Sequence, residues 1–398
     1  MNQVSECGRP DRSSNSTSLL VAPQVSRLLP VDALRGLIIV FMALDHASHF
    51  VAQKHSSGEM WGGPFPTYTD PLAFLTRLIT HFSAPGFFFL MGVGMFLFAT
   101  ARRRQGWSEW AIMRFFLIRG GILIALKFLL VNRAWELSSG GWGLSVYVGV
   151  LFALGGTMML GSFFLRLKAS YLLILTVVLF VGMELLVPAP GQWGPIKLTN
   201  PFDLLNPLLW EPGGVPEINL WSNYPVLPWL ELVIFGLAFG HWLVESEQRA
   251  YRRALILGGV FLLAFVVLRA LDGFGNIRPR MGNTWIDFLN VVKYPPSMTF
   301  TLLTMGVNLI LLSAFARMVE GMRPVLDTLA VFGRAPLFFY TVHLFLHAGI
   351  GWLFTPRGTS IPAMYPFWLL GLLILYPLCL WFGRLKQRQP ATSVLRFF

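Results

Sequence analysis

The stretch that decides the fold is VDALRGLIIVFMALDHASH, residues 31–49. It is long and apolar enough to cross a bilayer, because a transmembrane helix needs about 20 predominantly apolar residues. It nevertheless carries five ionisable side chains: Asp32, Arg35, Asp45, His46 and His49. At about 100° per residue, all five fit on an arc of about 140°. The sequence therefore predicts a transmembrane helix with one polar stripe along its whole length.

The composition of the whole chain excludes a soluble protein. Of its 398 residues, 55% are hydrophobic and only 13% are charged, and the mean hydropathy is +0.61. A soluble domain carries about 25% charged residues, so this chain lacks the polar surface that a water-exposed globule needs. Soluble-enzyme, disordered and fibrous classes are excluded on the same ground. We predict an all-α fold, namely a polytopic helix bundle integral to a lipid bilayer.

Ten apolar runs are long enough to be transmembrane helices. They cover residues 31–52, 72–100, 110–131, 142–164, 170–188, 225–246, 254–271, 296–318, 328–354 and 365–383. The runs predict one fused transmembrane domain at 28–385. A polar, disordered tail at 1–27 precedes this domain, and a short tail at 386–398 follows it.

The basic residues predict how the bundle is oriented. The net charge is +12, and arginine and lysine cluster in alternate connections, as at 102–104, 166–168 and 249–253. Cytoplasmic loops of membrane proteins are enriched in these residues, so we place both termini in the cytoplasm and the protein in the inner membrane. The same rule explains the charge without a nucleic-acid partner. The chain has two cysteines, Cys7 and Cys379, which argues against a disulfide framework.

Two further runs carry ionisable residues that a bilayer disfavours. In the second run, Arg77 and His81 lie one helical turn apart. In the ninth run, Arg334 lies in the cytoplasmic half, while His343 and His347 lie in the outer half. Chain direction brings these histidines to a depth similar to that of the histidines in the first run. This convergence favours a functional site over isolated helix contacts.

The residue types in this arrangement suit acyl transfer. Guanidinium groups bind phosphates, so we expect Arg35, Arg334 and Arg119 to bind a phosphorylated, CoA-like donor at the cytoplasmic end. Asp32 would pair with Arg35 at that end. Imidazole is the commonest general base, and His46 is the first candidate for a general base or a transient acyl acceptor.

The remaining candidates surround this histidine. Asp45 would orient His46, and His81 would join them as a catalytic residue. Six residues are candidates for binding the acceptor: His49, Arg77, His343, His347, Lys293 and Tyr294. The last two, in KYPPS at the start of the eighth run, could equally be an interface anchor.

Other functions use the same residue types. Asp45 and the nearby histidines could ligate a metal, but a specific signature such as HExxH is absent, and no metal is expected. A proton-coupled transporter would also place His, Asp and Arg inside the bundle, although we find no internal repeat of the kind such transporters often have. We keep the transporter as the alternative. A membrane scaffold protein ranks third, because it would not need convergent buried charges.

Several stretches resemble the transmembrane acyltransferase superfamily. The closer resemblance is to bacterial proteins with the heparan-α-glucosaminide N-acetyltransferase-type catalytic domain. The stretches that carry it are VDALRGLIIVFMALDH (31–46), LTRLITHFSAPGFFFLMG (75–92), YPVLPWLELVIFGLAFG (224–240), NVVKYPPS (290–297) and FGRAPLFFYTVHLFLHA (332–348). The resemblance implies transfer of an acyl group, with acetyl from acetyl-CoA as the expected donor, at or across the membrane. The implied acceptor is carbohydrate-like, and a homodimer is within expectation.

The resemblance bears on the choice of catalytic histidine. Ten residues separate Arg35 from His46, which is similar to the Arg-x10-His pattern of the related acyltransferase-3 branch and supports His46. The heparan enzymes, however, have Asn at the position aligned with His46, and their active histidine lies in the following outer loop. Here that loop reads VAQKHSSGEMWGG and contains His55. His55 therefore stays a second candidate.

Overall fold

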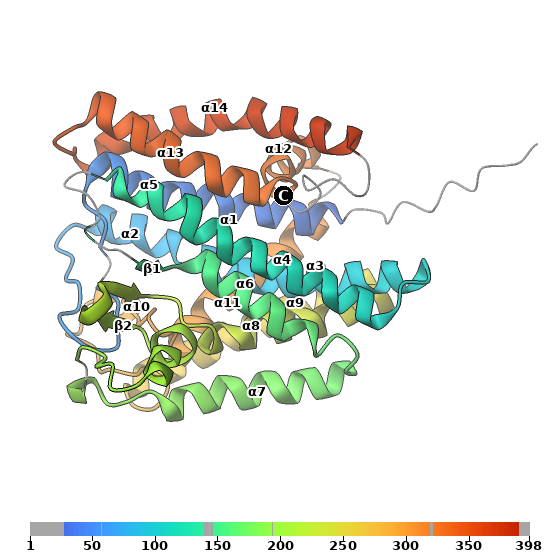
Figure 1. Ribbon diagram of the computed structural model, residues 1–398, viewed down its shortest axis with the longest axis horizontal. Coiled ribbons are helices and arrows are strands. Elements are labelled where there is room, and N and C mark those ends of the chain that lie inside the picture. The colour runs from blue at the N-terminus through green and yellow to red at the C-terminus, as the bar shows by residue number, and fades with distance from the viewer. Residues whose placement is uncertain are drawn as a thin grey trace, which may run out of the picture.

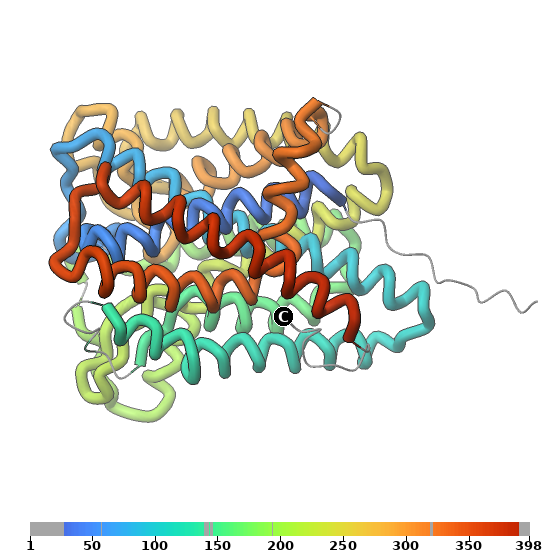
Figure 2. Tube along the Cα trace, turned by 90° about the horizontal axis from the view of Figure 1, so that it is seen from above, coloured from blue at the N-terminus to red at the C-terminus, as the bar shows by residue number. Residues whose placement is uncertain are grey.

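Most helices run along one common axis (Figures 1 and 2). The computed structural model describes residues 28–56, 58–138, 143, 146–192, 194–318 and 321–389. The predicted tail at 1–27 and the last residues, 390–398, lie outside the described residues. The α-helices are α1 (Leu29–Ala47), α2 (Pro71–Thr80), α3 (Ser83–Arg104), α4 (Glu109–Leu126), α5 (Asn132–Glu136), α6 (Val150–Ser162), α7 (Ala169–Leu186), α8 (Leu227–Glu245), α9 (Glu247–Leu271), α10 (Trp285–Leu289), α11 (Met298–Arg317), α12 (Arg323–Gly333), α13 (Pro336–Phe354) and α14 (Ile361–Arg388).

Shorter elements extend or connect these helices. Single π-helical turns continue α1 and α4 and also occur in the loop before α8: η1 (Ser48–Ala52), η2 (Lys127–Val131) and η5 (Asn206–Trp210). Three 3₁₀ turns lie in the connection between α7 and α8: η3 (Pro190–Gln192), η4 (Pro201–Leu204) and η6 (Pro216–Ile218). A small sheet has the order β1-β3-β2, with β1 parallel to β3 and β2 antiparallel to it. Its strands are β1 (Val146–Val148), β2 (Gly213–Val215) and β3 (Leu220–Ser222).

The prediction of a polytopic helix bundle with about ten spans is confirmed. In the part of the chain that is described, nine helical segments are long and apolar enough to cross a membrane, and α6 is a shorter apolar helix. The outermost helices expose large apolar side chains, such as Leu185 on α7, Leu263 on α9 and Leu373 on α14. An apolar surface of this kind is stable against lipid and not against water.

The fourth span is shorter than predicted. A helix over 142–164 was expected, but α6 has only 13 residues and is about 20 Å long, against a hydrocarbon core of about 30 Å. The difference arises because Val146–Val148 pair with β3 as a strand. Gly149, which has an extended backbone, separates this strand from α6. Hydrophobicity alone did not distinguish the buried strand from a continuation of the helix.

The ninth apolar run is two helices and not one. The expected span over 328–354 is interrupted at Arg334 and Ala335, between α12 and α13. Pro336 begins α13, and a proline disfavours the α conformation in the residue before it. Ala335 accordingly leaves the helical region, with φ −127° and ψ 50°. The break allows α12 to run across the bundle while α13 follows its axis (Figures 1 and 2).

The second run is also interrupted. Pro85 has no backbone N–H and disfavours regular helix in the preceding turn, and the chain forms a turn at His81 and Phe82 between α2 and α3. The Nδ2 atom of Asn308 on α11 donates a hydrogen bond to the Phe82 carbonyl (3.0 Å). The interruption fixes the end of α2, which carries several polar residues of the site, beside α1.

Close backbone packing joins α12 to α1. A Cβ atom on Gly333 would overlap the Asp32 carbonyl, and one on Gly36 would overlap the Leu329 carbonyl. Small residues at such crossings let two helix backbones approach within van der Waals contact. As a result, the residue that follows α12, Arg334, lies beside the first turn of α1.

The two ends of the bundle differ in character. The start of α1 and the end of α14 lie at the same end of the bundle (Figure 1). We call this the basic end, because Arg35, Arg102, Arg334 and Lys386 lie there. The sheet and the long connections lie at the opposite end, which we call the strand end.

Candidate active site

A large cavity follows α1 through the bundle. Its volume is about 620 Å³, and its lining extends from Leu28 to His46. These residues are about 27 Å apart along a helix that rises 1.5 Å per residue. The lining includes Gln105, an exposed residue at the basic end, so the cavity reaches the surface there. We call this space the main cavity and the region around His46 its deep end.

At the basic end, one carboxylate holds two arginines. Asp32 Oδ1 accepts a hydrogen bond from Arg35 Nη1 (2.9 Å), and Asp32 Oδ2 lies 3.5 Å from Arg334 Nε. Arg35 Nη1 also donates to the Gly333 carbonyl (3.3 Å). All three charged residues line the main cavity. The predicted grouping of these residues is therefore present, and Asp32 orients the two guanidinium groups.

Arg119 adds a third guanidinium group to this end of the cavity. It comes from α4, lines the main cavity, and its Nε atom is buried without a hydrogen-bond partner among the described residues. Arg102 and Lys386 line the same end. Cations therefore outnumber carboxylates here, and guanidinium donors are left over. An anion such as a phosphate group satisfies both conditions.

The deep end carries polar groups on an otherwise apolar wall. The lining there includes His46, Asp45, Thr80, Lys293 and Tyr224. His46 is almost fully buried, and its Nδ1 atom lies 2.6 Å from Nε2 of the buried His343. The sequence-based expectation that the histidines of the first and ninth runs lie at one depth agrees with this contact.

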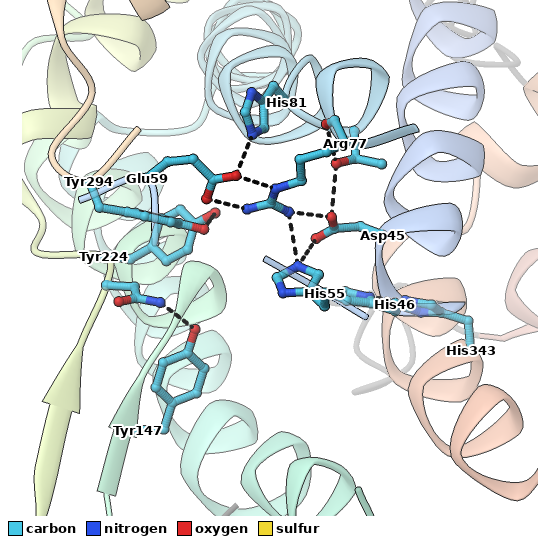
Figure 3. A network of polar contacts seen from close by, with 12 residues as sticks. Asp45, His46, His55, Glu59, Arg77, His81, Tyr147, Tyr224, Tyr294 and His343 are labelled. Atoms are coloured by element: carbon cyan, nitrogen blue, oxygen red, sulfur yellow. Dashed lines mark hydrogen bonds and ion pairs between the residues drawn. The ribbon is translucent and has the colours of Figure 1, made fainter. Parts of the chain in front are cut away.

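Beside the deep end, Arg77 joins two carboxylates (Figure 3). Its Nε and Nη2 atoms donate to the two oxygens of Glu59, at 2.6 and 2.8 Å. Its Nη1 atom donates to Asp45 Oδ1 at 2.5 Å, and Thr80 donates to the same oxygen at 2.8 Å. Arg77 and Glu59 are buried. A bidentate, fully hydrogen-bonded pair of this kind is the arrangement that compensates burial of the two charges.

The structure places Asp45 against His55 and not against His46. His55 Nε2 lies 3.2 Å from Asp45 Oδ2 and 2.9 Å from Arg77 Nη1 (Figure 3). Asp45 and His46 are adjacent in sequence, so on a helix their side chains diverge by about 100°. The expected role of Asp45 in orienting His46 therefore does not match this geometry. The second candidate histidine, His55, lies in the ion-pair network beside the cavity, whereas His46 lines the cavity itself.

Three other predicted histidines lie apart from the cavity lining. His81 Nε2 lies 3.5 Å from Glu59 Oε1 (Figure 3), so it belongs to the ion-pair network. The His49 ring packs edge-on against Trp135, with 4.8 Å between ring centroids. His347 donates from Nδ1 to the His343 carbonyl (2.8 Å), and its Nε2 edge faces Gly371 of α14.

The predicted pair Lys293 and Tyr294 is tied to the loop that carries Glu59. The backbone N–H groups of both residues donate to the Glu59 carbonyl, at 2.9 and 3.0 Å. The Tyr294 hydroxyl contacts the Tyr224 hydroxyl at 3.5 Å. Lys293 is buried and faces the main cavity, whereas Tyr294 is not part of the lining. The two residues thus connect the loop to the segment that precedes α11, and Lys293 brings a positive charge to the deep end.

Burial and neighbouring charges shift the pKa values of these loop residues. Burial alone would raise the pKa of Glu59, but the charge and hydrogen bonds of Arg77 hold it well below the ordinary value of 4.5. Burial, and secondarily the charge of Arg77, lowers the pKa of Lys293 from 10.5 to about 8. Glu59 is therefore a carboxylate at neutral pH. The pKa of Lys293 lies near the pH at which most enzymes work.

Sequence reasoning missed Glu59, which is fully buried and central to the network. A signal for it did exist. Arg77 is a cation within an apolar run, and such residues usually have a partner. Glu59 is the one acidic residue between Lys54 and Tyr68, in the loop that leads into that run. A search for the missing countercharge would have found it.

The donor set does not resemble a metal centre. In the segments that the structure describes, no group of three or more His, Cys, Asp or Glu side chains is arranged to hold a metal ion. The carboxylates of Asp45 and Glu59 bind Arg77 instead.

The fold and the site together define a polytopic membrane protein whose cavity connects a cationic end to a buried histidine. The family model described as "Heparan-alpha-glucosaminide N-acetyltransferase, catalytic" matches residues 27–271, and the chain belongs to this family. The membership indicates an acetyltransferase-type enzyme, and the resemblance stated from the sequence is confirmed. No curated protein matches the chain.

The ion-pair network predicts a large stability effect for Glu59→Gln. The change replaces one of the two carboxylates that bind the buried Arg77 with a neutral amide, and breaking a buried ion pair costs about 3–5 kcal/mol. The control is Glu136→Gln, which breaks a half-exposed ion pair with Arg133 and should cost about 1 kcal/mol or less. Thermal unfolding of the detergent-solubilised variants measures both. Equal melting temperatures for the two variants would contradict the structural role of Glu59.

Proposed function

We propose that the protein transfers an acyl group, most simply acetyl, from a cytoplasmic acyl-CoA to a carbohydrate-like acceptor at or across the membrane. The observation that carries the proposal is the main cavity, which joins four arginines at one end to a buried histidine at the other. Family membership supports an acetyl group. In this proposal the basic end faces the cytoplasm, in agreement with the distribution of arginine and lysine in the loops.

The basic end would bind the phosphates of the donor. Arg35 and Arg334 are held by Asp32, while Arg119 has an unpaired buried donor. Arg35 and His46 are eleven positions apart along α1, which corresponds to about 16 Å. This length suits an extended pantetheine arm between phosphates at the basic end and a thioester at the deep end. The donor would then fill the cavity lengthwise.

The deep end would carry out the chemistry. His46 would take the proton of an acceptor hydroxyl or amino group, whose oxygen or nitrogen attacks the thioester carbonyl carbon. The new C–O or C–N bond forms as the C–S bond breaks, and the CoA thiolate departs. His46 then gives the proton to the thiolate sulfur. The Lys293 ammonium group, on the same wall, would stabilise the negative charge that develops on the carbonyl oxygen.

A first prediction concerns the base. His46→Ala should lower acyl transfer by about 10²- to 10⁴-fold, because it removes the proton acceptor, and should leave the melting temperature nearly unchanged. The measurement is CoA release from acetyl-CoA by purified protein in lipid nanodiscs with amino-sugar acceptors. The control is His241→Ala, which removes a half-buried histidine of α8 that contacts the Leu167 carbonyl, outside the cavity lining. Activity of His46→Ala within a few-fold of the wild type would refute the assignment.

A second prediction concerns the donor site. Arg35→Ala should raise the KM for acetyl-CoA about tenfold or more, since hydrogen bonds to charged groups contribute about 1.5–3 kcal/mol. The KM for the acceptor should change much less. Arg114→Ala, which alters an exposed arginine of α4, is the control. Stabilisation of the wild type by acetyl-CoA in a thermal melt tests binding directly. If acetyl-CoA does not stabilise the protein and proteoliposomes take up a small molecule in response to a proton gradient, the transporter is favoured instead.

A third prediction concerns pH. The pKa of Lys293 is about 8, so its ammonium form predominates below pH 8 and is lost above it. The kcat of acyl transfer should therefore fall as the pH rises through about 8. Lys293→Arg, which keeps its charge, should move this loss to higher pH, whereas Lys293→Met should be slow at every pH. A wild-type profile that instead rises through pH 8 and levels off would identify neutral Lys293 as a base and contradict the proposed role.

A further inference from the structure

His343 contacts the proposed base directly and has no contact with the cavity. It lies on α13, is fully buried, and is not among the described residues that line the main cavity. Its Nε2 atom lies 2.6 Å from Nδ1 of His46, and the two rings are nearly stacked, with 4.8 Å between centroids. Because His46 lines the cavity and His343 does not, any part that His343 plays in the chemistry is exerted through His46.

The other ring nitrogen of His343 fixes where the protons are. Nδ1 of His343 lies 2.9 Å from the Phe339 carbonyl oxygen. A carbonyl oxygen can only accept, so Nδ1 carries the hydrogen. In a neutral ring Nε2 is then unprotonated, and it must accept the hydrogen bond from His46. His46 therefore carries its hydrogen on Nδ1, and its Nε2 atom holds a lone pair.

The environment of His46 keeps the ring in this orientation. Trp135 packs edge-on against it at 5.3 Å between ring centroids, and Tyr340 does so at 6.4 Å. Nε2 of His46 has no hydrogen bond to any described residue. It is also not one of the described polar atoms that are fully buried without a partner, so it is accessible. The nitrogen that can take a proton is thus the one available to the cavity.

We propose that His343 is a positioning residue, which holds His46 in the tautomer whose Nε2 is a proton acceptor. This inference rests on the proposed acyl transfer and deepens it. When His46 takes the acceptor's proton on Nε2, its Nδ1–H stays hydrogen-bonded to the neutral His343. The proton is not passed on through His343, because Nδ1 of His343 is hydrogen-bonded to the Phe339 carbonyl oxygen, which does not take up a proton. It is returned to the departing CoA thiolate instead, so that His46 is neutral again after each turnover.

The tautomer can be measured without any substrate. The chain has seven histidines, so ¹⁵N-histidine labelling in nanodiscs gives few signals, and His46→Ala identifies those of His46. We expect the wild-type spectrum to report a protonated Nδ1 and an unprotonated Nε2 on His46. In His343→Leu the acceptor is lost, and the His46 signals should shift toward a mixture of tautomers. His343→Gln places an amide oxygen near the position of the lost nitrogen and should preserve the wild-type signals.

Kinetics then test whether the tautomer matters. His343→Leu should lower kcat by about 100-fold, a typical contribution of a correctly poised base, with little change in the KM for acetyl-CoA. His343→Gln should restore kcat to within about tenfold of the wild type. His241→Leu removes a histidine outside the site and should behave like the wild type in both measurements.

The outcomes separate the two proposals. A His46 that is protonated on Nε2 in the wild type overturns the positioning role, and so does a His343→Leu variant that turns over like the wild type. Equal losses in His343→Leu and His343→Gln with an unchanged His46 spectrum would show that His343 is only structural. A wild type that transfers no acyl group refutes the proposed function instead, while the spectrum still decides the tautomer.

Discussion

The guanidinium group of Arg77 is the constraint on which the site depends. A cation buried among apolar helices is tolerated only if carboxylates and hydrogen bonds replace its water. Here the two carboxylates come from different parts of the chain, since Asp45 belongs to α1 and Glu59 to the following loop. Their attraction to Arg77 therefore brings the loop back over the bundle end and fixes α2 beside α1. The Glu59 carbonyl in turn accepts the N–H groups of Lys293 and Tyr294, so the start of α11 depends on the same cation.

The two ends of the main cavity differ in how their positive and negative charges are balanced. At the deep end, the cations Arg77 and Lys293 face the carboxylates of Asp45 and Glu59, so the network is neutral without any histidine. Consequently neither His46 nor His343 is needed as a cation to balance the charge there, which is consistent with the neutral pair proposed above. At the basic end, Asp32 is the one carboxylate among the described lining residues, against Arg35, Arg102, Arg119 and Arg334. That end is left with positive charge, which an anionic ligand would neutralise. The two ends therefore differ in net charge, as the proposed separation of anion binding from proton transfer along one cavity requires.

Much of this arrangement could be predicted from the helical periodicity of the first run. The stripe of Asp32, Arg35 and His46 does face one cavity, because a straight α-helix preserves the angular relation of its residues over many turns. For Arg334 and Asp32, and for His343 and His46, the sequence predicted only a similar depth in the membrane and not the contact itself. Their partners depend on how α12 and α13 separate at Ala335 and Pro336, which a continuous apolar run does not reveal.

The errors have a common physical origin. Asp45 was expected to orient His46, but its partner is set by Arg77 and by a loop whose path cannot be derived from periodicity. The predicted fourth span included residues that form β1, since a short apolar strand and an apolar helix have the same composition. His81 was expected near His46, yet the turn that precedes Pro85 directs it to Glu59. In each case a contact between distant segments overrode a local pattern.

The site also extends beyond the part of the chain that defines the family. The family match ends at residue 271, at the end of α9. It includes α1, α2 and the cavity-lining Arg119 of α4. Lys293, Arg334, Tyr340 and His343 all follow it, although three of them line the main cavity and the fourth holds His46. The helices after α9 are therefore part of the cavity and not an accessory to it. They help to line the cavity, supply one of its four arginines and place His343 against His46, so the proposed chemistry would require both parts of the bundle.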